Sequence, residues 1–530
     1  MRGHIMNRRL YSVFLAVALA ALPSAAAIQQ SVKVKSGLIS GAAASDPSIE
    51  VFKGIPYAAP PVGDLRWRAP RSPAAWQGVR KTDQFSASCV QNIVTERKPW
   101  TVEFMAHGQI SEDCLYLNVW TPAKSSAEKR PVLLWMYGGG NVEGSASVPV
   151  YDGESLAKKG LVVVTINYRL GVFGFFTHPA LTKESDTSGN YGILDQVAAL
   201  KWVHDNIAAF GGDPARVTIA GQSAGASDAH TLVASPSAKG LFAGAIEESG
   251  SNIAATLRTL SEQEKDGVRF AEAKGAHSLA DLRAISWKDL MTPVTVAGSD
   301  APLRFAPVVD GHLLPAQPNE IFAQGKQNDV PELTGLNKDD LGGGVPHPDT
   351  TPEAFEKSAR QRYGDMSGAF LKLYPAGSSK EQAGLSQNAS LRDQMRTSMY
   401  LWALNRAKTA KTKAFTYYWD HTLPGPDADK YGAFHTSEVP YVFNSLAKSD
   451  RPFTDADHKI AEMMSSYWAN FATTGNPNGK GLPHWPSVSE KPGMTMEVGD
   501  TTAPIRIAGD KAKEEFFAEF FAKQRPAQRP

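Results

Sequence analysis

Short runs of β-branched and aromatic residues recur along the chain, and longer segments with helical periodicity separate them. These runs cover residues 132–137, 161–168, 217–220 and 415–419, and a further run at residues 330–337 ends in a loop. In the segment 193–210, apolar residues recur at helical spacing, so we expect one face of a helix to be buried there. Continuous apolar strands that alternate with helices are typical of a mostly parallel sheet covered on both faces. The pattern therefore predicts an α/β fold.

The region of residues 250–400 is more polar, with strong helical patterning and few strand signals. Glycine and proline cluster at residues 58–63, 342–348 and 424–432, which indicates long connections. None of these connections resembles a flexible linker between domains. We expect the middle region to supply helices beside or over a functional site.

The N-terminal segment has the three parts of a secretory signal peptide. Arg8 and Arg9 precede an apolar run at residues 11–22, and Ala25, Ala26 and Ala27 supply the small residues of a cleavage site. We expect residues 1–27 to be removed and the chain to be exported, so that it is periplasmic or secreted. No later segment approaches about 20 consecutive apolar residues, so the sequence predicts no membrane anchor after cleavage.

Charge and cysteine content narrow the classes of partner. The formal net charge is +1, and removal of residues 1–27 lowers the count of Lys and Arg from 55 to 52 against 54 Asp and Glu, which gives −2. A nearly neutral chain offers no strong electrostatic footprint to nucleic acid. In an oxidising compartment we expect the two cysteines, Cys89 and Cys114, to form a disulfide, the alternative being two buried free thiols. With no pair of histidines nearby, they indicate no metal site.

The pentapeptide at residues 221–225, Gly-Gln-Ser-Ala-Gly, places a serine between small neighbours. It follows the apolar run 217–220 and precedes a segment of helical pattern, residues 226–233. A serine at a tight turn between strand and helix has strained backbone angles that expose its hydroxyl, so its neighbours must be small. Because the bare pattern is common, it is the position between strand and helix that makes Ser223 a candidate nucleophile.

A serine hydroxyl needs a general base within hydrogen-bond reach and an acid that orients this base. In folds with such a turn the chain order is serine, acid, histidine. Asp339 and Asp340 follow a predicted strand, and adjacent residues point in different directions, so only one of them can face the base. Five histidines come later in the chain: His347, His421, His435, His458 and His484. Both His421 and His435 follow the strand 415–419, and the residues alone choose neither between these two nor between the two aspartates.

Three consecutive glycines, residues 138–140, follow directly on a predicted strand, roughly 80 residues before the serine. Backbone N–H groups of such a loop, with that of the residue after the serine, bind the negative charge of a tetrahedral intermediate. Loss of one such donor typically costs about 10²-fold to 10³-fold in rate. The alternative is a plain glycine turn.

Four segments carry a resemblance to the type-B carboxylesterases, the family that also contains cholinesterases and bile-salt-activated lipases. They are Phe-Lys-Gly-Ile-Pro-Tyr-Ala at residues 52–58, Glu-Asp-Cys-Leu-Tyr-Leu-Asn at 112–118, Tyr-Gly-Gly-Gly at 137–140, and Phe-Gly-Gly-Asp at 210–213 leading into 221–225. Together with residues 305–314 and 432–443 they span nearly the whole chain after residue 27. The resemblance implies one α/β-hydrolase domain, residues 28–530, with a large, mostly parallel sheet and helical insertions over the active site.

The resemblance also implies a catalytic triad of Ser223, His435 and Asp340. The base lies in Gly-Ala-Phe-His-Thr-Ser-Glu at residues 432–438, a pattern similar to the family's. The acid is the fourth residue of Asn-Lys-Asp-Asp-Leu at residues 337–341, where the family has Asn-Lys-Asp-Glu-Gly. The resemblance thus implies Asp340 rather than Asp339 as the acid and His435 rather than His421 as the base; which aspartate faces His435 is a question for the structure.

By the same matching, the backbone amides of Gly139, Gly140 and Ala224 form an oxyanion hole. The two cysteines match the family's first disulfide loop. Residues near Phe305 are expected to form the acyl pocket, and the disulfide loop with Trp100 to form part of the wall of the gorge.

Three positions depart from the family pattern. Asp340 stands where the family usually has Glu, which shortens the reach of the acid by one methylene, and Leu341 replaces the usual glycine. At the position beside the nucleophile, where cholinesterases carry Glu, the chain has Gln222. This removes a negative charge that would favour a cationic substrate, so we do not expect choline esters.

These observations predict two-step acyl transfer on small to medium neutral or aromatic esters, without metal or organic cofactor. Arg304, beside Phe305, is a candidate partner for a substrate carboxylate, against the alternative of a surface or structural role. The same site chemistry serves amides, carbamates and polyesters, and a non-catalytic binding protein is a further alternative. The oligomeric state does not follow from the sequence.

Overall fold

The computed structural model describes residues 31–251, 256–295, 301–340 and 350–524. The predicted signal peptide at residues 1–27, Leu341 and His347 lie outside the described residues.

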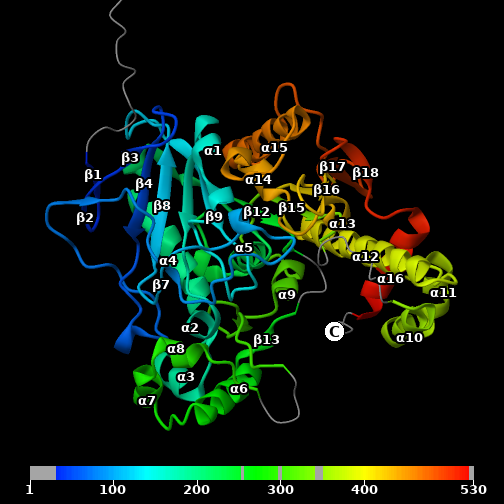
Figure 1. Ribbon diagram of the computed structural model, residues 1–530, viewed down its shortest axis with the longest axis horizontal. Helices are drawn as coiled ribbons and strands as arrows, with labels where there is room; N and C mark the ends of the chain where they lie inside the picture. Colours follow the sequence, from blue (N-terminus) through cyan, green and yellow to red (C-terminus); the bar gives the residue numbers. More distant parts are fainter. Residues whose placement is uncertain (1–30, 252–255, 296–300, 341–349, 525–530) are drawn as a thin grey trace, which may run out of the picture.

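An eleven-stranded sheet runs through the centre of the molecule (Figure 1). In spatial order its strands are β18 (Ala503–Arg506), β17 (Met494–Val498), β16 (Ala414–Trp419), β15 (Glu332–Asn337), β12 (Gly244–Glu248), β11 (Gly212–Gln222), β9 (Arg130–Met136), β10 (Val162–Ile166), β8 (Tyr116–Thr121), β4 (Glu50–Pro56) and β3 (Ala42–Ala43). From β17 to β10 all neighbours pair in parallel, whereas the pairs at both ends of the sheet are antiparallel. The predicted α/β fold with a mostly parallel sheet is confirmed.

Each apolar run identified in the sequence forms a strand of this sheet, namely β9, β10, β11, β15 or β16. Strand β11 begins earlier than predicted, because Gly212 pairs with Arg130 of β9 before a register shift leads into the apolar part at Val217. The predicted helix is α4 (Tyr191–Asn206), continued by a 3-10 turn at Ile207–Phe210.

Helices pack along the sheet and bury its central strands, including the glutamates of β12 and β15. Strands β10, β12, β15 and β16 are buried along their whole length. The helices that contact the sheet are α1 (Glu154–Lys158), α4, α5 (Ala224–Ala234), α12 (Lys380–Thr409) and α15 (Asp455–Thr474). A strand whose residues are all buried must be covered on both faces, and these helices provide the cover.

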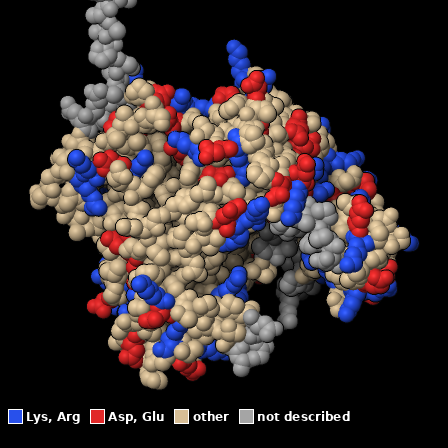
Figure 2. Space-filling view, in the orientation of Figure 1, with Lys and Arg blue, Asp and Glu red and all other residues tan. Residues whose placement is uncertain are grey.

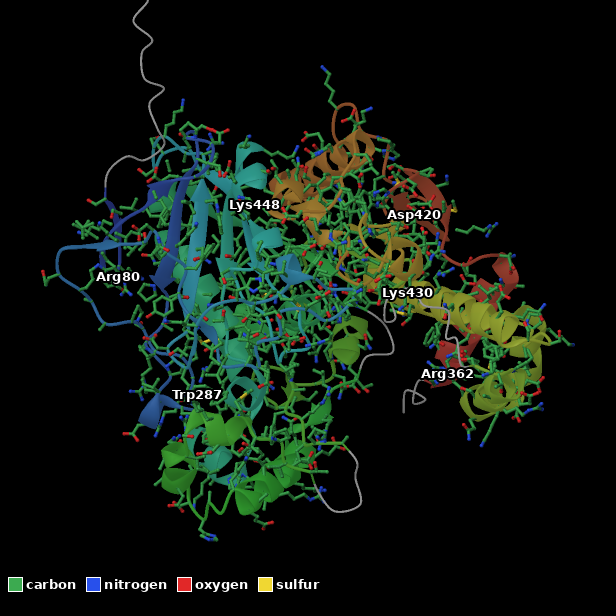
Figure 3. The ribbon with its side chains drawn as sticks, viewed as in Figure 1. Arg80, Trp287, Arg362, Asp420, Lys430 and Lys448 are labelled. Carbon is green, nitrogen blue, oxygen red and sulfur yellow. A yellow bond between two sulfur atoms is a disulfide. The ribbon has the colours of Figure 1, made fainter. Side chains whose placement is uncertain are left out.

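Two further groups of helices extend from the sheet (Figure 1). One, at the bottom of the view, contains α3 (Pro179–Ser185), α6 (Leu260–Ala273), α7 (Leu279–Ala284) and α8 (Trp287–Met291). The other, at the right, contains α10 (Pro352–Tyr363), α11 (Ser367–Leu373) and α16 (Lys511–Gln524) beside α12, and has its own aromatic core. Arg362 marks α10 in Figure 3. The middle of the chain is thus rich in helices, as predicted.

Shorter elements complete the described fold. Strands β1 (Val32–Val34), β2 (Gly37–Ser40) and β5 (Val79–Lys81) form a small sheet, and β6 (Ser88–Cys89) pairs with β7 (Ile110–Ser111), as β13 (Arg258–Thr259) does with β14 (Val308–Val309). The remaining α-helices are α2 (Gly171–Phe175), α9 (Pro318–Ala323), α13 (Ala428–Tyr431) and α14 (Val439–Val442).

A disulfide joins Cys89 to Cys114, which confirms the predicted pairing. The sequence separation is 25 residues. On the chain-entropy model a loop of this length stabilises the fold by roughly 3 to 4 kcal/mol. The bond ties the loop that carries Trp100 to the segment leading into β8.

The surface mixes charges of both signs. Figure 2 shows Lys and Arg interspersed with Asp and Glu over the face in view. None of the described helices combines the length and apolar character that a membrane span needs.

Candidate active site

Ser223 lies at a sharp turn between β11 and α5. Its backbone has φ 58° and ψ −121°, and its N–H donates to the carbonyl of Glu248 at the end of β12, at 2.7 Å. A Cβ atom on Gly225 would lie 2.1 Å from the carbonyl oxygen of Met136, so helix α5 approaches β9 as closely as only glycine permits. The five-residue pattern thus forms the expected turn, with the serine side chain partly exposed.

The acid and the histidine come from the ends of two neighbouring strands. Strands β15 and β16 are parallel and pair Asn337 with Trp419, so both chains leave the sheet at the same edge. Asp340 follows three residues after β15, and His435 lies in the connection after β16. His435 Nδ1 is hydrogen-bonded to Asp340 Oδ1. The carboxylate is only 4% exposed and the imidazole 23%, so one ring edge stays accessible.

The two competing residues have other partners. Asp339 Oδ2 accepts a hydrogen bond from the backbone N–H of Ala433 at 3.0 Å, which fixes the loop that carries His435. The ring of His421 lies between Asp457 and Asp500, at 2.9 and 2.5 Å. The structure therefore brings Asp340, and not Asp339, to His435.

Gln222 contacts the second nitrogen of the histidine. Its Nε2 lies 3.2 Å from His435 Nε2 and 3.5 Å from Nδ1, and its Oε1 accepts from Thr436 Oγ1 at 3.3 Å. With the Nδ1 proton directed at Asp340, Nε2 carries the lone pair and accepts from the glutamine amide. Within the described part of the chain, no hydrogen bond joins Ser223 and His435. Such bonds are often long without substrate and tighten in the complex.

The electrostatic surroundings of His435 favour its charged form. Burial alone would lower the pKa of the imidazole, but the negative charge and hydrogen bond of Asp340 outweigh it and raise the pKa above the ordinary 6.5. The buried carboxyl of Glu438, three residues further on, accepts from Asn337 Nδ2. Burial raises the pKa of Glu438 to about 7. Sequence reasoning did not single out Glu438, whose only signal is its closeness to His435 in the chain.

The three backbone amides of the predicted oxyanion hole come from the glycine loop after β9 and from the residue after the serine. The N–H groups of Gly139, Gly140 and Ala224 have no hydrogen-bond acceptor among the described residues. Gly139 has φ +104°, and a Cβ on it would lie 2.2 Å from the carbonyl oxygen of Glu143, so only glycine fits this loop. Unpaired amides at a strand-to-helix turn can bind an oxyanion.

One cavity of about 490 Å³ adjoins the serine, the histidine and two of the three amides, whereas Ala224 is not among its lining residues. Ser223, His435, Gly139 and Gly140 line it, and its size suits a small organic molecule. Trp100 forms part of the wall and donates through Nε1 to the backbone carbonyl of His435 at 2.9 Å.

Only some of the other predicted pocket residues line this cavity. Gln222 and Arg304 line the cavity, but Phe305 does not. Phe305 is 5% exposed, and its ring packs against Phe176 and Phe270, with centroids 5.1 and 5.6 Å apart. Phe305 is therefore stabilised by burial in an aromatic cluster and not by contact with a substrate. Its neighbour Arg304 lines the cavity in its place.

The cavity wall contains an ion pair that the sequence did not predict. Arg97 donates two hydrogen bonds to the carboxylate of Glu143, at 2.8 and 2.6 Å, and both side chains line the cavity. The two residues are 46 positions apart. No local pattern indicates their pairing.

Among the described residues, one group of side chains has the chemistry and spacing of metal ligands: His230, Glu247 and Glu332. All three are buried, and none lines the cavity. Arg406 pairs with Glu332, and Ser251 donates to Glu247, so both carboxylates already have partners. We assign this group no part in the reaction.

A serine on a sharp turn after a central parallel strand, with a carboxylate and a histidine after later strands of the same sheet, defines an α/β hydrolase. The profile of the carboxylesterase family matches residues 28–517. Over 485 residues the chain is 38% identical to a fumonisin B1 esterase of Sphingopyxis macrogoltabida, covering 88% of this chain and 85% of the relative. It is 36% identical over 472 residues to a human cocaine esterase, covering 83% and 82%. The chain belongs to the carboxylesterase family and is a carboxylic-ester hydrolase.

Solved structures agree with this assignment. A PNB esterase superimposes with a TM-score of 0.77 at 30% sequence identity, covering 92% of this chain and 99% of that one. This similarity supports the α/β fold with its large, mostly parallel sheet and flanking helices.

Proposed function

We propose that Ser223, His435 and Asp340 form a catalytic triad that hydrolyses carboxylic esters through an acyl-enzyme intermediate. The observation that carries the proposal is the arrangement of His435. Its Nδ1 is bound to the buried carboxylate of Asp340, while its other edge lines the same cavity as Ser223. This is the geometry in which an imidazole accepts a proton from a serine and keeps the correct tautomer.

In the first step the hydroxyl of Ser223 attacks the ester carbonyl while His435 Nε2 accepts its proton. The carbonyl oxygen becomes negative and is held by the amides of Gly139, Gly140 and Ala224. His435 then donates the proton to the leaving alcohol, which leaves an acyl-serine. Water repeats these steps and releases the acid. Asp340 stays ionised and stabilises the imidazolium.

For His435 to accept the serine proton, the hydrogen bond from Gln222 must give way. Thr436 holds the other end of the glutamine amide. Because Gln222 is neutral, it adds no negative charge beside the nucleophile, and we infer that the cavity accepts small to medium neutral and aromatic esters rather than cationic ones.

We further propose that residues 1–27 are a signal peptide, that residues 28–530 form one hydrolase domain, and that the protein is periplasmic or secreted. The disulfide between Cys89 and Cys114 supports export, because such bonds persist in oxidising compartments. The match to the family profile begins at residue 28, where the apolar leader ends.

Activity on matched esters and amides tests this proposal. We expect residues 28–530 to hydrolyse 4-nitrophenyl acetate, butyrate and octanoate, with the rates on the three esters reporting the size of the acyl site. The same acyl groups on 4-nitroaniline should react far more slowly, and release of the chromophore measures both. Faster cleavage of the anilides would favour an amide hydrolase, and no turnover of any substrate by folded protein would favour a binding protein.

The dependence of the rate on pH follows from the raised pKa of His435. The histidine must be neutral to accept the serine proton, so kcat/KM should fall as the pH drops through this pKa. Since the pKa lies above 6.5, we expect the midpoint of the acid limb above pH 6.5, with a slope of one proton. Initial rates on 4-nitrophenyl butyrate between pH 5 and 9 measure it. A midpoint clearly below 6.5 would contradict the assigned pairing of His435 with Asp340.

A further inference from the structure

Charge in the catalytic cavity is unevenly distributed. Among the described residues that line it, three side chains carry a permanent charge: Arg97, Glu143 and Arg304. The first two neutralise each other through two hydrogen bonds. Arg304 is exposed and has no carboxylate partner among the described residues. Among the described residues, the cavity wall therefore presents one guanidinium without a carboxylate partner to a molecule that binds beside Ser223.

The backbone on both sides of Arg304 is fixed. Leu303 donates from its N–H to the carbonyl of Val294 at 2.8 Å, and the ring of Phe305 is buried in the aromatic cluster. Ala306 donates to Gln263 Oε1 at 3.3 Å. An arginine held on an anchored segment loses less conformational entropy on binding than one on a free loop.

We propose that Arg304 is a carboxylate-binding residue of this cavity, and that the enzyme prefers esters that carry a free carboxylate. A guanidinium presents a planar fork of N–H donors that matches the two oxygens of a carboxylate. Neutral esters still react, because the triad and oxyanion hole do not depend on this contact. The inference rests on the proposed function, since it concerns substrates of the same site.

The test compares esters that differ in the carboxylate alone. Mono-4-nitrophenyl glutarate and 4-nitrophenyl valerate have acyl chains of the same length and the same leaving group, and only the first carries a carboxylate on the acyl side. The ester 3-acetoxybenzoate and its neutral amide, 3-acetoxybenzamide, place the difference on the alcohol side. Release of nitrophenol or acetic acid gives kcat/KM for each ester.

We expect Arg304→Gln to lower kcat/KM about tenfold on the carboxylate ester of one pair and less than about twofold on its neutral partner. The pair that responds tells whether the carboxylate belongs to the acyl or the alcohol part. Arg304→Lys should retain part of the preference, because the charge remains but the fork is lost. Added salt should weaken the preference of the wild type, since Arg304 is exposed.

Arg362→Gln is the matched control. Arg362 is an exposed arginine on α10, outside the cavity lining (Figure 3), and its loss should change neither pair. Equal losses on charged and neutral esters, or no loss on either, would overturn the role of Arg304. Such results would leave the proposed function intact as long as hydrolysis depends on Ser223. If the wild type hydrolyses none of the four esters, the proposed function fails before this inference is reached.

Discussion

Replacing Ser223 with Ala should abolish ester hydrolysis, with a loss in kcat of about 10⁶-fold, the size seen when a triad serine is removed elsewhere. The hydroxyl supplies the atom that forms the acyl-enzyme, and neither His435 nor the unpaired amides can replace it. Turnover of 4-nitrophenyl butyrate by the purified protein, residues 28–530, measures the loss. Thermal unfolding of the same sample should be little changed, because the serine side chain makes no hydrogen bond that holds the fold.

Ser227→Ala is the control for this experiment. Ser227 is one turn further along α5, its side chain is exposed, and it lies outside the cavity lining. We expect its loss to change the rate by less than about twofold, as surface substitutions have small effects. If Ser223→Ala retained more than about one hundredth of the activity, another residue would have to be the nucleophile.

Replacing Asp340 with Asn should lower kcat about 10⁴-fold, because an amide neither stabilises the imidazolium nor favours the correct tautomer of His435. The same change removes the charge that raises the pKa of His435, so the acid limb of the pH profile should move to lower pH. Rates on 4-nitrophenyl butyrate from pH 5 to 9 give both effects.

Substitution of the adjacent Asp339 distinguishes a catalytic effect from a structural one. Asp339 accepts from the backbone of Ala433 and lies 3.5 Å from Arg392, without contact to His435. Asp339→Asn should therefore lower stability by about 1 kcal/mol while kcat stays within about tenfold of the wild type. Urea unfolding measures the change in stability, and the ester assay measures kcat. Were Asp339→Asn the more damaging change for kcat, with its acid limb shifted, the acid would have to be reassigned.

The parallel part of the sheet was predictable where its strands contain continuous apolar runs, as in β9 and β10, whereas β12 ends in two buried glutamates and was not indicated by such a run. Runs of this kind, between helices of the expected period, leave few alternatives to a parallel sheet covered on both faces. The strand before Ser223 was predictable for the same reason, although its polar start at Gly212 was not, since residues 212–216 lie outside the apolar run. Such extensions depend on the neighbouring strand and leave no mark in local sequence.

The pairing of Asp340 with His435 shows where reasoning from local pattern stops. Two aspartates and two histidines stood at equivalent places after predicted strands, and only the family resemblance separated them. The structure adds the reason: Asp339 is held by the backbone of Ala433, which leaves its neighbour to face the ring. The ion pair of Arg97 and Glu143 and the burial of Phe305 are set by contacts distant in the sequence, so no local pattern indicated them.

The positive φ of Ser223 has a consequence for the evolution and engineering of this chain. A residue other than glycine in such a conformation costs of order 1–3 kcal/mol, against a total margin of about 5–15 kcal/mol for a folded domain. Glycine adopts the same angles readily, so selection for thermal stability alone would favour glycine at this turn. Serine at this position therefore lowers the stability of the fold. Substitutions meant to stabilise the protein have more to gain in the outer helices than at the turn of Ser223.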